Sequence, residues 1–116
     1  MESPLIALIT DFGSDSHYPG VMKGVIHNIH PKARIVDVTH DIEPFNLMQA
    51  SYVLDSVQSY VPIPTIFLCV VDTGVGSQRR PIIGVGENNY YIAPDNGVLT
   101  RVSTGDSFSR VIHVEE

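Results

Sequence analysis

The chain has 116 residues, of which 43% are hydrophobic and 17% are charged, and its mean hydropathy is +0.10. This composition is typical of one folded domain, because disordered chains are less apolar and more highly charged. The formal net charge of −6 comes without any basic run, so we expect neither a nucleic-acid surface nor a patch for anionic membranes. A small molecule or another protein is the expected partner.

Cys69 is the single cysteine, which excludes disulfides within the chain and zinc sites built from several cysteines. The first ten residues lack the basic start and the long apolar core of a signal peptide. No stretch approaches the roughly 20 apolar residues that a membrane helix needs. We therefore expect a cytoplasmic protein in a reducing compartment, with no contact to a membrane.

Strands and helices alternate in the first part of the predicted fold. Short apolar runs predict three buried strands, at residues 5–10, 34–39 and 65–71. A first amphipathic helix is expected between Tyr18 and Pro31, with its N-cap among residues 14–16. A second helix is expected between Asn46 and Pro62, where Asn46 and Gln49 form a variant of the capping box.

The βαβαβ order of these elements predicts an α/β fold with a mainly parallel sheet flanked by helices. After residue 80 the pattern changes to short strand candidates separated by turn residues, at 82–86, 90–93, 98–102 and 110–114. Such segments are typical of hairpins and edge strands. We therefore predict one α/β domain over residues 1–116, with short antiparallel strands toward the C-terminus.

Polar residues follow all three predicted parallel strands. Asp11 follows the first strand, His40 and Asp41 follow the second, and Asp72 follows the third. Ligands of open parallel α/β sheets bind beyond the carboxyl ends of the strands, so we expect a site at this edge. Each aspartate taken alone could instead cap a helix or a loop. Clustered carboxylates also suit magnesium, so a metal held by Asp11, Asp41 and Asp72 is an alternative.

The segment from Asp72 to Arg80 is the densest polar feature of the chain. Its two glycines allow the backbone to approach a ligand, and Asp72 and Arg79 supply a carboxylate and a guanidinium seven residues apart. It lacks the pattern of a phosphate-binding loop, and its glycines are too few for a dinucleotide fingerprint. The alternative interpretation is a tight turn that carries surface arginines.

Five separated motifs occur in one order along residues 5–102: Ile9-Thr10-Asp11-Phe12-Gly13, Met22-Lys23-Gly24-Val25-Ile26, Ile35-Val36-Asp37-Val38-Thr39-His40, Val70 to Arg80, and Pro94-Asp95-Asn96-Gly97-Val98-Leu99-Thr100. Together they resemble the S-adenosylmethionine hydrolases (S-adenosyl-L-methionine hydroxide adenosyltransferases), relatives of the fluorinases and chlorinases. The resemblance implies an N-terminal α/β domain, a smaller β-barrel-like domain and assembly into trimers. Substrate would lie between the first domain of one subunit and the second domain of its neighbour. Residues 1–116 match the first domain only, so we expect a homotrimer or another form of self-association.

The reaction that the resemblance implies is displacement at the ribose C5′ carbon, without a cofactor. Water expels methionine from the sulfonium of S-adenosylmethionine and leaves adenosine. Asp72 and Arg79 match the hydrolytic residues that place one water in line, whereas the halogenating relatives carry other side chains there. Asp11 matches the aspartate that binds the ribose hydroxyls. Phe45 and Thr73 match positions close to the substrate, although Phe45 could equally be a core or helix-staple residue.

Half of the adenosine pocket would lie on the second domain, so we expect weak or absent turnover by residues 1–116 alone. Two other functions stay open. One is a non-catalytic domain that binds adenosine or S-adenosylmethionine and oligomerises, and the other is a magnesium-dependent phosphohydrolase. The sequence departs from the family where Ser16 replaces an aspartate and Thr73 replaces a proline. The family's catalytic histidine lies in a later segment, so His113 is not assigned that role.

Overall fold

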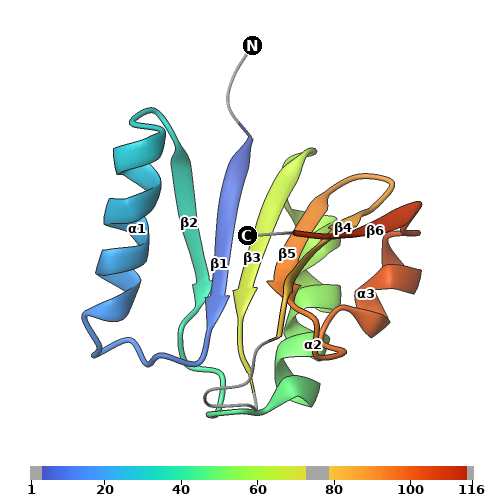
Figure 1. Cartoon of the computed structure of the whole chain (residues 1–116), viewed down its shortest axis with the longest axis horizontal. Coiled ribbons are helices and arrows are strands. Elements are labelled where there is room, and N and C mark those ends of the chain that lie inside the picture. The colour runs from blue at the N-terminus through green and yellow to red at the C-terminus, as the bar shows by residue number, and fades with distance from the viewer. Residues whose placement is uncertain (1–3, 73–78, 115–116) are drawn as a thin grey trace.

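Within residues 4–72 and 79–114, which the computed structural model describes, six strands form one mixed sheet (Figure 1). The strands are β1 (Leu5–Thr10), β2 (Arg34–Thr39), β3 (Thr65–Val70), β4 (Pro81–Val85), β5 (Tyr90–Pro94) and β6 (Arg110–His113). The helices are α1 (Tyr18–Ile29), α2 (Leu47–Val57) and α3 (Thr100–Gly105), and the 3-10 helix η1 (Gln58–Tyr60) continues α2.

The strand order is β2-β1-β3-β5-β4-β6. β1 runs parallel to β2 and β3, β3 runs parallel to β5, and β4 is antiparallel to β5 and β6. The prediction of a mainly parallel α/β sheet with antiparallel strands toward the C-terminus is therefore confirmed. The carboxyl ends of β1, β2, β3 and β5 all lie at the lower edge of the sheet in Figure 1.

The core lies between the sheet and the helices α2 and α3. Burial alternates from residue to residue along the strands, because successive side chains point to opposite faces of a sheet. In β3, Phe67 and Cys69 are fully buried, whereas Leu68 between them is half-buried. From the helices, Leu54 and Val102 complete this core. α1 stands apart beside β2, at the far side of the molecule from α3 (Figure 1). No helix among the described residues is long and apolar enough to cross a membrane.

The predicted strand at residues 98–102 is wrong, because the chain forms α3 there. Gly97 adopts a φ of +87°, a conformation that glycine reaches without steric cost. The Asn96 Oδ1 atom accepts a hydrogen bond from the Val98 N–H, which closes the turn at 3.1 Å. Leu99 and Val102 are both buried at a spacing of three residues, with Thr100 and Arg101 exposed between them, which fits the period of a helix rather than that of a strand.

The caps of the two long helices follow the prediction only in part. Asn46 accepts a hydrogen bond from the Gln49 N–H at 3.0 Å and so caps α2 as predicted. The Gln49 side chain does not close the capping box, because its Oε1 atom accepts from the Glu43 N–H instead. At α1 the N-cap is His17, without a side-chain cap, and not a residue of 14–16.

Candidate active site

The predicted pair Asp72 and Arg79 meets at the carboxyl end of β3. Asp72 follows the fully buried Val71, and Arg79 lies two residues before β4. The Nε atom of Arg79 lies 3.1 Å from the Oδ1 atom of Asp72, and the two side chains are 36% and 28% exposed. An ion pair with this exposure contributes at most about 1 kcal/mol to stability. The ion pair therefore matters less for stability than for bringing a carboxylate and a guanidinium together at the edge of the sheet. The predicted residue Thr73 lies outside the described residues.

Asp11 emerges from the strand next to the one that carries Asp72. Thr10 is the register partner of Val70, so the two aspartates follow neighbouring parallel strands at the same edge. The Oδ2 atom of Asp11 accepts a hydrogen bond from the Phe45 N–H at 3.0 Å. A carboxylate has about four acceptor positions, so this bond leaves Asp11 able to accept from ligand hydroxyls.

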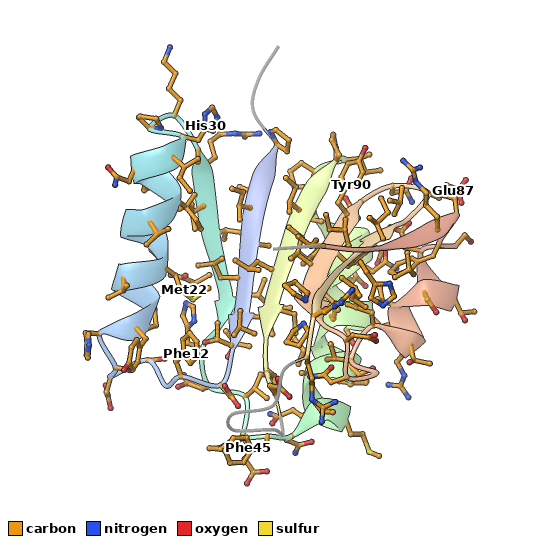
Figure 2. The ribbon with its side chains drawn as sticks, in the orientation of Figure 1. Phe12, Met22, His30, Phe45, Glu87 and Tyr90 are labelled. Atoms are coloured by element: carbon orange, nitrogen blue, oxygen red, sulfur yellow. The ribbon has the colours of Figure 1, made fainter. Side chains whose placement is uncertain are left out.

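Phe45 lies at the lower edge of the molecule, beyond the strand ends (Figure 2). Its side chain is 52% exposed, which excludes it from the buried core. Its φ is +64°, a left-handed conformation that is rare for a residue with a bulky side chain. Such strained residues cluster at functional sites. The bond from the Phe45 N–H to Asp11 holds this loop against the end of β1.

The polar residues after β2 have structural partners and line a separate pocket, of about 360 Å³, which does not include Asp72 or Arg79. Asp41 accepts hydrogen bonds from the Ser14 N–H at 2.9 Å and from the Ser14 hydroxyl at 2.5 Å. The Ser14 hydroxyl is the main cause that lowers the pKa of Asp41. His40 is buried, with its Nδ1 atom 2.8 Å from the Thr10 hydroxyl and its Nε2 atom 2.7 Å from Asp37. These contacts connect the ends of β1 and β2.

The magnesium alternative required Asp11, Asp41 and Asp72 to converge. Within the described parts of the chain, no group of three His, Cys, Asp or Glu side chains is placed to hold a metal ion. Asp11 and Asp41 are instead hydrogen-bonded to Phe45 and Ser14 respectively. The three aspartates therefore do not form the metal site that the sequence allowed.

A pocket of about 330 Å³ opens beside the Asp72–Arg79 pair. Apart from these two side chains its lining is largely apolar and comes from β3, β5 and the start of β4; it includes Leu68, Val70, Ile92 and Pro94. Ligand pockets are commonly about 300–1,000 Å³ and combine apolar walls with a few polar groups. The arrangement can therefore hold an organic ligand with its reacting atoms near a carboxylate.

Asn96 was missed as a residue of this region. Its Nδ2 amide donates a hydrogen bond to the Val71 carbonyl, immediately before Asp72, at 2.8 Å. The sequence indicated a turn at Asn96 and Gly97 within one of the five motifs of the resemblance, but it gave Asn96 no contact with the Asp72 segment. The contact depends on β5 lying parallel and adjacent to β3, which brings its carboxyl end to the same edge. The short apolar runs around this turn are typical of hairpin strands, so the position of Asn96 beside β3 could not be assigned from the sequence.

Comparisons with known proteins agree on one family. The family model of the SAM hydroxide adenosyltransferase N-terminal domain matches residues 6–116. A protein from Methanocaldococcus jannaschii named (R)-S-adenosyl-L-methionine hydrolase is 40% identical over 117 residues, which cover 97% of this chain and 44% of that enzyme. A fluorinase from Actinopolyspora mzabensis is 25% identical, over 96% of this chain and 45% of its own length.

The fold is shared with a solved structure. The crystal structure of an uncharacterized conserved protein from Thermotoga maritima aligns with a TM-score of 0.90 at 45% sequence identity. The alignment covers 95% of this chain and 43% of that protein. The chain thus spans less than half the length of the relatives that it matches. By the family match and by its identity to the hydrolase, the chain belongs to the SAM hydroxide adenosyltransferase family, whose N-terminal domain it contains.

Proposed function

We propose that this chain provides the ribose-binding and water-directing residues of an S-adenosylmethionine hydrolase. The observation that carries the proposal is the ion pair of Asp72 and Arg79, 3.1 Å apart, at the same sheet edge as Asp11. The 40% identity to the M. jannaschii hydrolase supports hydrolysis, and the lower identity to the fluorinase argues against halogenation.

In this reaction the main task of the protein is to place the water and the substrate correctly relative to each other. A lone pair of the water oxygen forms the bond to C5′, and the C5′–S bond breaks with its electrons going to sulfur. The sulfonium thereby becomes the neutral thioether of methionine and needs no acid to leave. Asp72 accepts the proton that the attacking water loses, and Arg79 holds the carboxylate in position. In-line placement of the water supplies most of the rate enhancement.

The nucleoside is held by Asp11 in this proposal. Its carboxylate accepts hydrogen bonds from the two ribose hydroxyls, since ionised acceptors form the stronger bonds of this kind. Phe45, whose backbone N–H binds Asp11, offers an aromatic side chain that is about half exposed. Thr73, directly after Asp72 in the chain, is also assigned to substrate binding. S-adenosylmethionine is then the substrate, and the reaction uses no cofactor.

The proposal includes assembly and location. Residues 1–116 act as one N-terminal domain in the cytoplasm, and the domain self-associates as a homotrimer whose subunits share the substrate pocket. Four apolar side chains on α1 support self-association, because each is at least half exposed on one side of the helix: Tyr18, Val21, Val25 and Ile29. Contiguous apolar surface of this kind marks sites of protein association.

The test is incubation of the purified chain with S-adenosylmethionine, with chromatography of adenosine and methionine. We expect slow formation of both products in equal amounts, unchanged by a chelator. Arg79→Ala should lower the rate by about 100-fold, the scale of a lost positioning or acid–base group. Loss of product on adding chelator would contradict a reaction that needs no metal. Adenosine binding that depends on Asp11, without any product, would favour the non-catalytic alternative.

A further inference from the structure

The turn between β5 and α3 touches both ends of the segment that carries the Asp72–Arg79 pair. On one side the Asn96 Nδ2 amide donates to the Val71 carbonyl at 2.8 Å. On the other side the Asp95 N–H donates to the Arg80 carbonyl at 3.0 Å. Two neighbouring residues of one turn thus hold the chain immediately before Asp72 and immediately after Arg79.

The Asn96 side chain is itself fixed in one orientation. Its Oδ1 atom accepts from the Val98 N–H at 3.1 Å while its Nδ2 atom donates to Val71. Both neighbours are anchored, because Val71 is fully buried and Val98 is only 1% exposed. Because the Asn96 side chain is hydrogen-bonded at both its oxygen and its nitrogen, it holds the Val71 peptide in a fixed position relative to the core. Asp72, the next residue, is thereby held in place as well.

We propose that Asn96 is a positioning residue for the reaction, acting through Val71 on Asp72 and its ion pair with Arg79. This inference deepens the proposed function and rests on it for its kinetic consequence only. The Asn96 amide lies outside the pair itself and so is not assigned any contact with substrate. Its role is to keep the carboxylate where the attacking water must be.

The expected size of the effect follows from geometry. Displacing a reacting group by about 1 Å can cost roughly 100-fold in rate even when the change is far from the chemistry. Loss of the amide leaves the Val71 carbonyl without this donor and frees the start of the Asp72 segment. A purely positional loss lowers kcat and leaves KM nearly unchanged.

Asn96→Asp tests the hydrogen bond from the Asn96 Nδ2 amide to the Val71 carbonyl. Aspartate keeps an oxygen for the Val98 N–H but offers no amide to Val71. Asn96→Ser, which also keeps an oxygen acceptor and adds no charge, guards against an effect of the new carboxylate or a failure to fold.

Asn89→Ala is the matched control. Asn89 directly precedes β5, whereas Asn96 follows the other end of β5. The Oδ1 atom of Asn89 accepts from the Thr65 N–H at 2.8 Å, and its Nδ2 atom donates to the Gln58 carbonyl at 3.1 Å. Figure 2 shows the neighbouring Tyr90 at the edge of the molecule away from Phe45. The control removes an asparagine amide that binds the first residue of β3 and η1, at the end of β3 opposite to Asp72.

Two measurements are made on the full chain. The first is the NMR signal of the Arg79 Nε–H group, with Asp72→Asn as the reference for a broken ion pair. The second is the steady-state rate of adenosine release from S-adenosylmethionine. We expect Asn96→Asp and Asn96→Ser to move the Arg79 signal toward the reference and to lower kcat about tenfold or more, with KM changed less than about threefold. Asn89→Ala should leave both readouts at their wild-type values.

The inference is overturned if the Arg79 signal of both Asn96 variants stays at the wild-type position. It is also overturned if Asn89→Ala moves that signal as far as they do, because the effect would then be general loosening of the fold. If the Arg79 signal moves as expected but the wild-type chain releases no adenosine, the positioning of the ion pair by Asn96 stands and the proposed function fails.

Discussion

Ser14 and Asp41 form a contact whose strength a titration measures directly. The Ser14 hydroxyl and the Ser14 N–H lower the pKa of Asp41 from its ordinary value of 3.8. Because the folded pKa lies below the unfolded one, the stabilisation from this contact is present above about pH 4 and is lost as the pH falls through the folded pKa. Ser14→Ala should move the pKa of Asp41 up toward 3.8, as followed by NMR of the carboxyl carbon.

Ser16→Ala is the control for this titration. The Ser16 hydroxyl accepts from the Tyr18 N–H at 3.1 Å, whereas the bonds to Asp41 come from Ser14. Removal of the Ser16 hydroxyl should leave the pKa of Asp41 unchanged. An equal shift in both variants, or none with Ser14→Ala, would show that the serine hydroxyl does not lower the pKa.

Cys69 gives a second prediction for a single side chain. Burial, with a smaller contribution from the negative charge of Asp11, raises the pKa of the Cys69 thiol to about 12. The thiol is therefore neutral at pH 8 and, being fully buried, out of reach of reagents. Iodoacetamide should label the native chain far more slowly than the chain in denaturant, as measured by mass spectrometry. Complete labelling of the native chain within minutes would contradict this environment.

The β4–β5 hairpin depends on one buried carboxylate that follows α3. Asp106 is 2% exposed and accepts from the Asn88 N–H, the Asn89 N–H and the Tyr91 hydroxyl at 3.1, 3.0 and 2.8 Å. Burial, and next the bond to Asp106, raises the pKa of Tyr91. Asp106→Ala leaves these donors without their acceptor, so we expect a loss of about 3 kcal/mol in the free energy of unfolding. Urea denaturation measures this loss.

Asp95→Ala is the matched control for this element. Asp95 pairs with His113 at 3.0 Å, but both side chains are 53% exposed. Removal of such a surface pair should cost no more than about 1 kcal/mol. A loss for Asp106→Ala as small as that for Asp95→Ala would show that the hairpin does not depend on the buried carboxylate.

The contrast between β3 and α3 explains how much of the elements the sequence could predict. The run at residues 65–71 contains enough branched and apolar side chains for only one interpretation, and β3 forms there. The run at 98–102 also contains apolar residues, but Thr100 and Arg101 interrupt them, and the run is too short to distinguish a strand from a helix by periodicity. Its conformation is decided by the turn at Gly97 and by the packing of Val102 in the core. These contacts between distant segments are not visible in the local sequence.

The whole molecule brings residues from distant parts of the chain to one edge of the sheet. Asp11 and Asp72 could be placed there from the sequence, because each directly follows an apolar run that is predicted to form a parallel strand. The burial of His40 between Thr10 and Asp37, and the contact of Asn96 with the Asp72 segment, depend on strand order and were not predictable. The sequence therefore locates the charged groups, and the topology supplies the contacts that hold them.

The central claim is that Asp72 and Arg79 direct water onto C5′ of S-adenosylmethionine. The most direct measurement is turnover in water enriched in oxygen-18, for the wild-type chain and for Asp72→Asn, each with and without the C-terminal part of the M. jannaschii hydrolase. We predict one heavy oxygen in the 5′-hydroxyl of adenosine, none in methionine, and no product from the variant. Product from Asp72→Asn at the wild-type rate, or no adenosine from any sample, would contradict the claim.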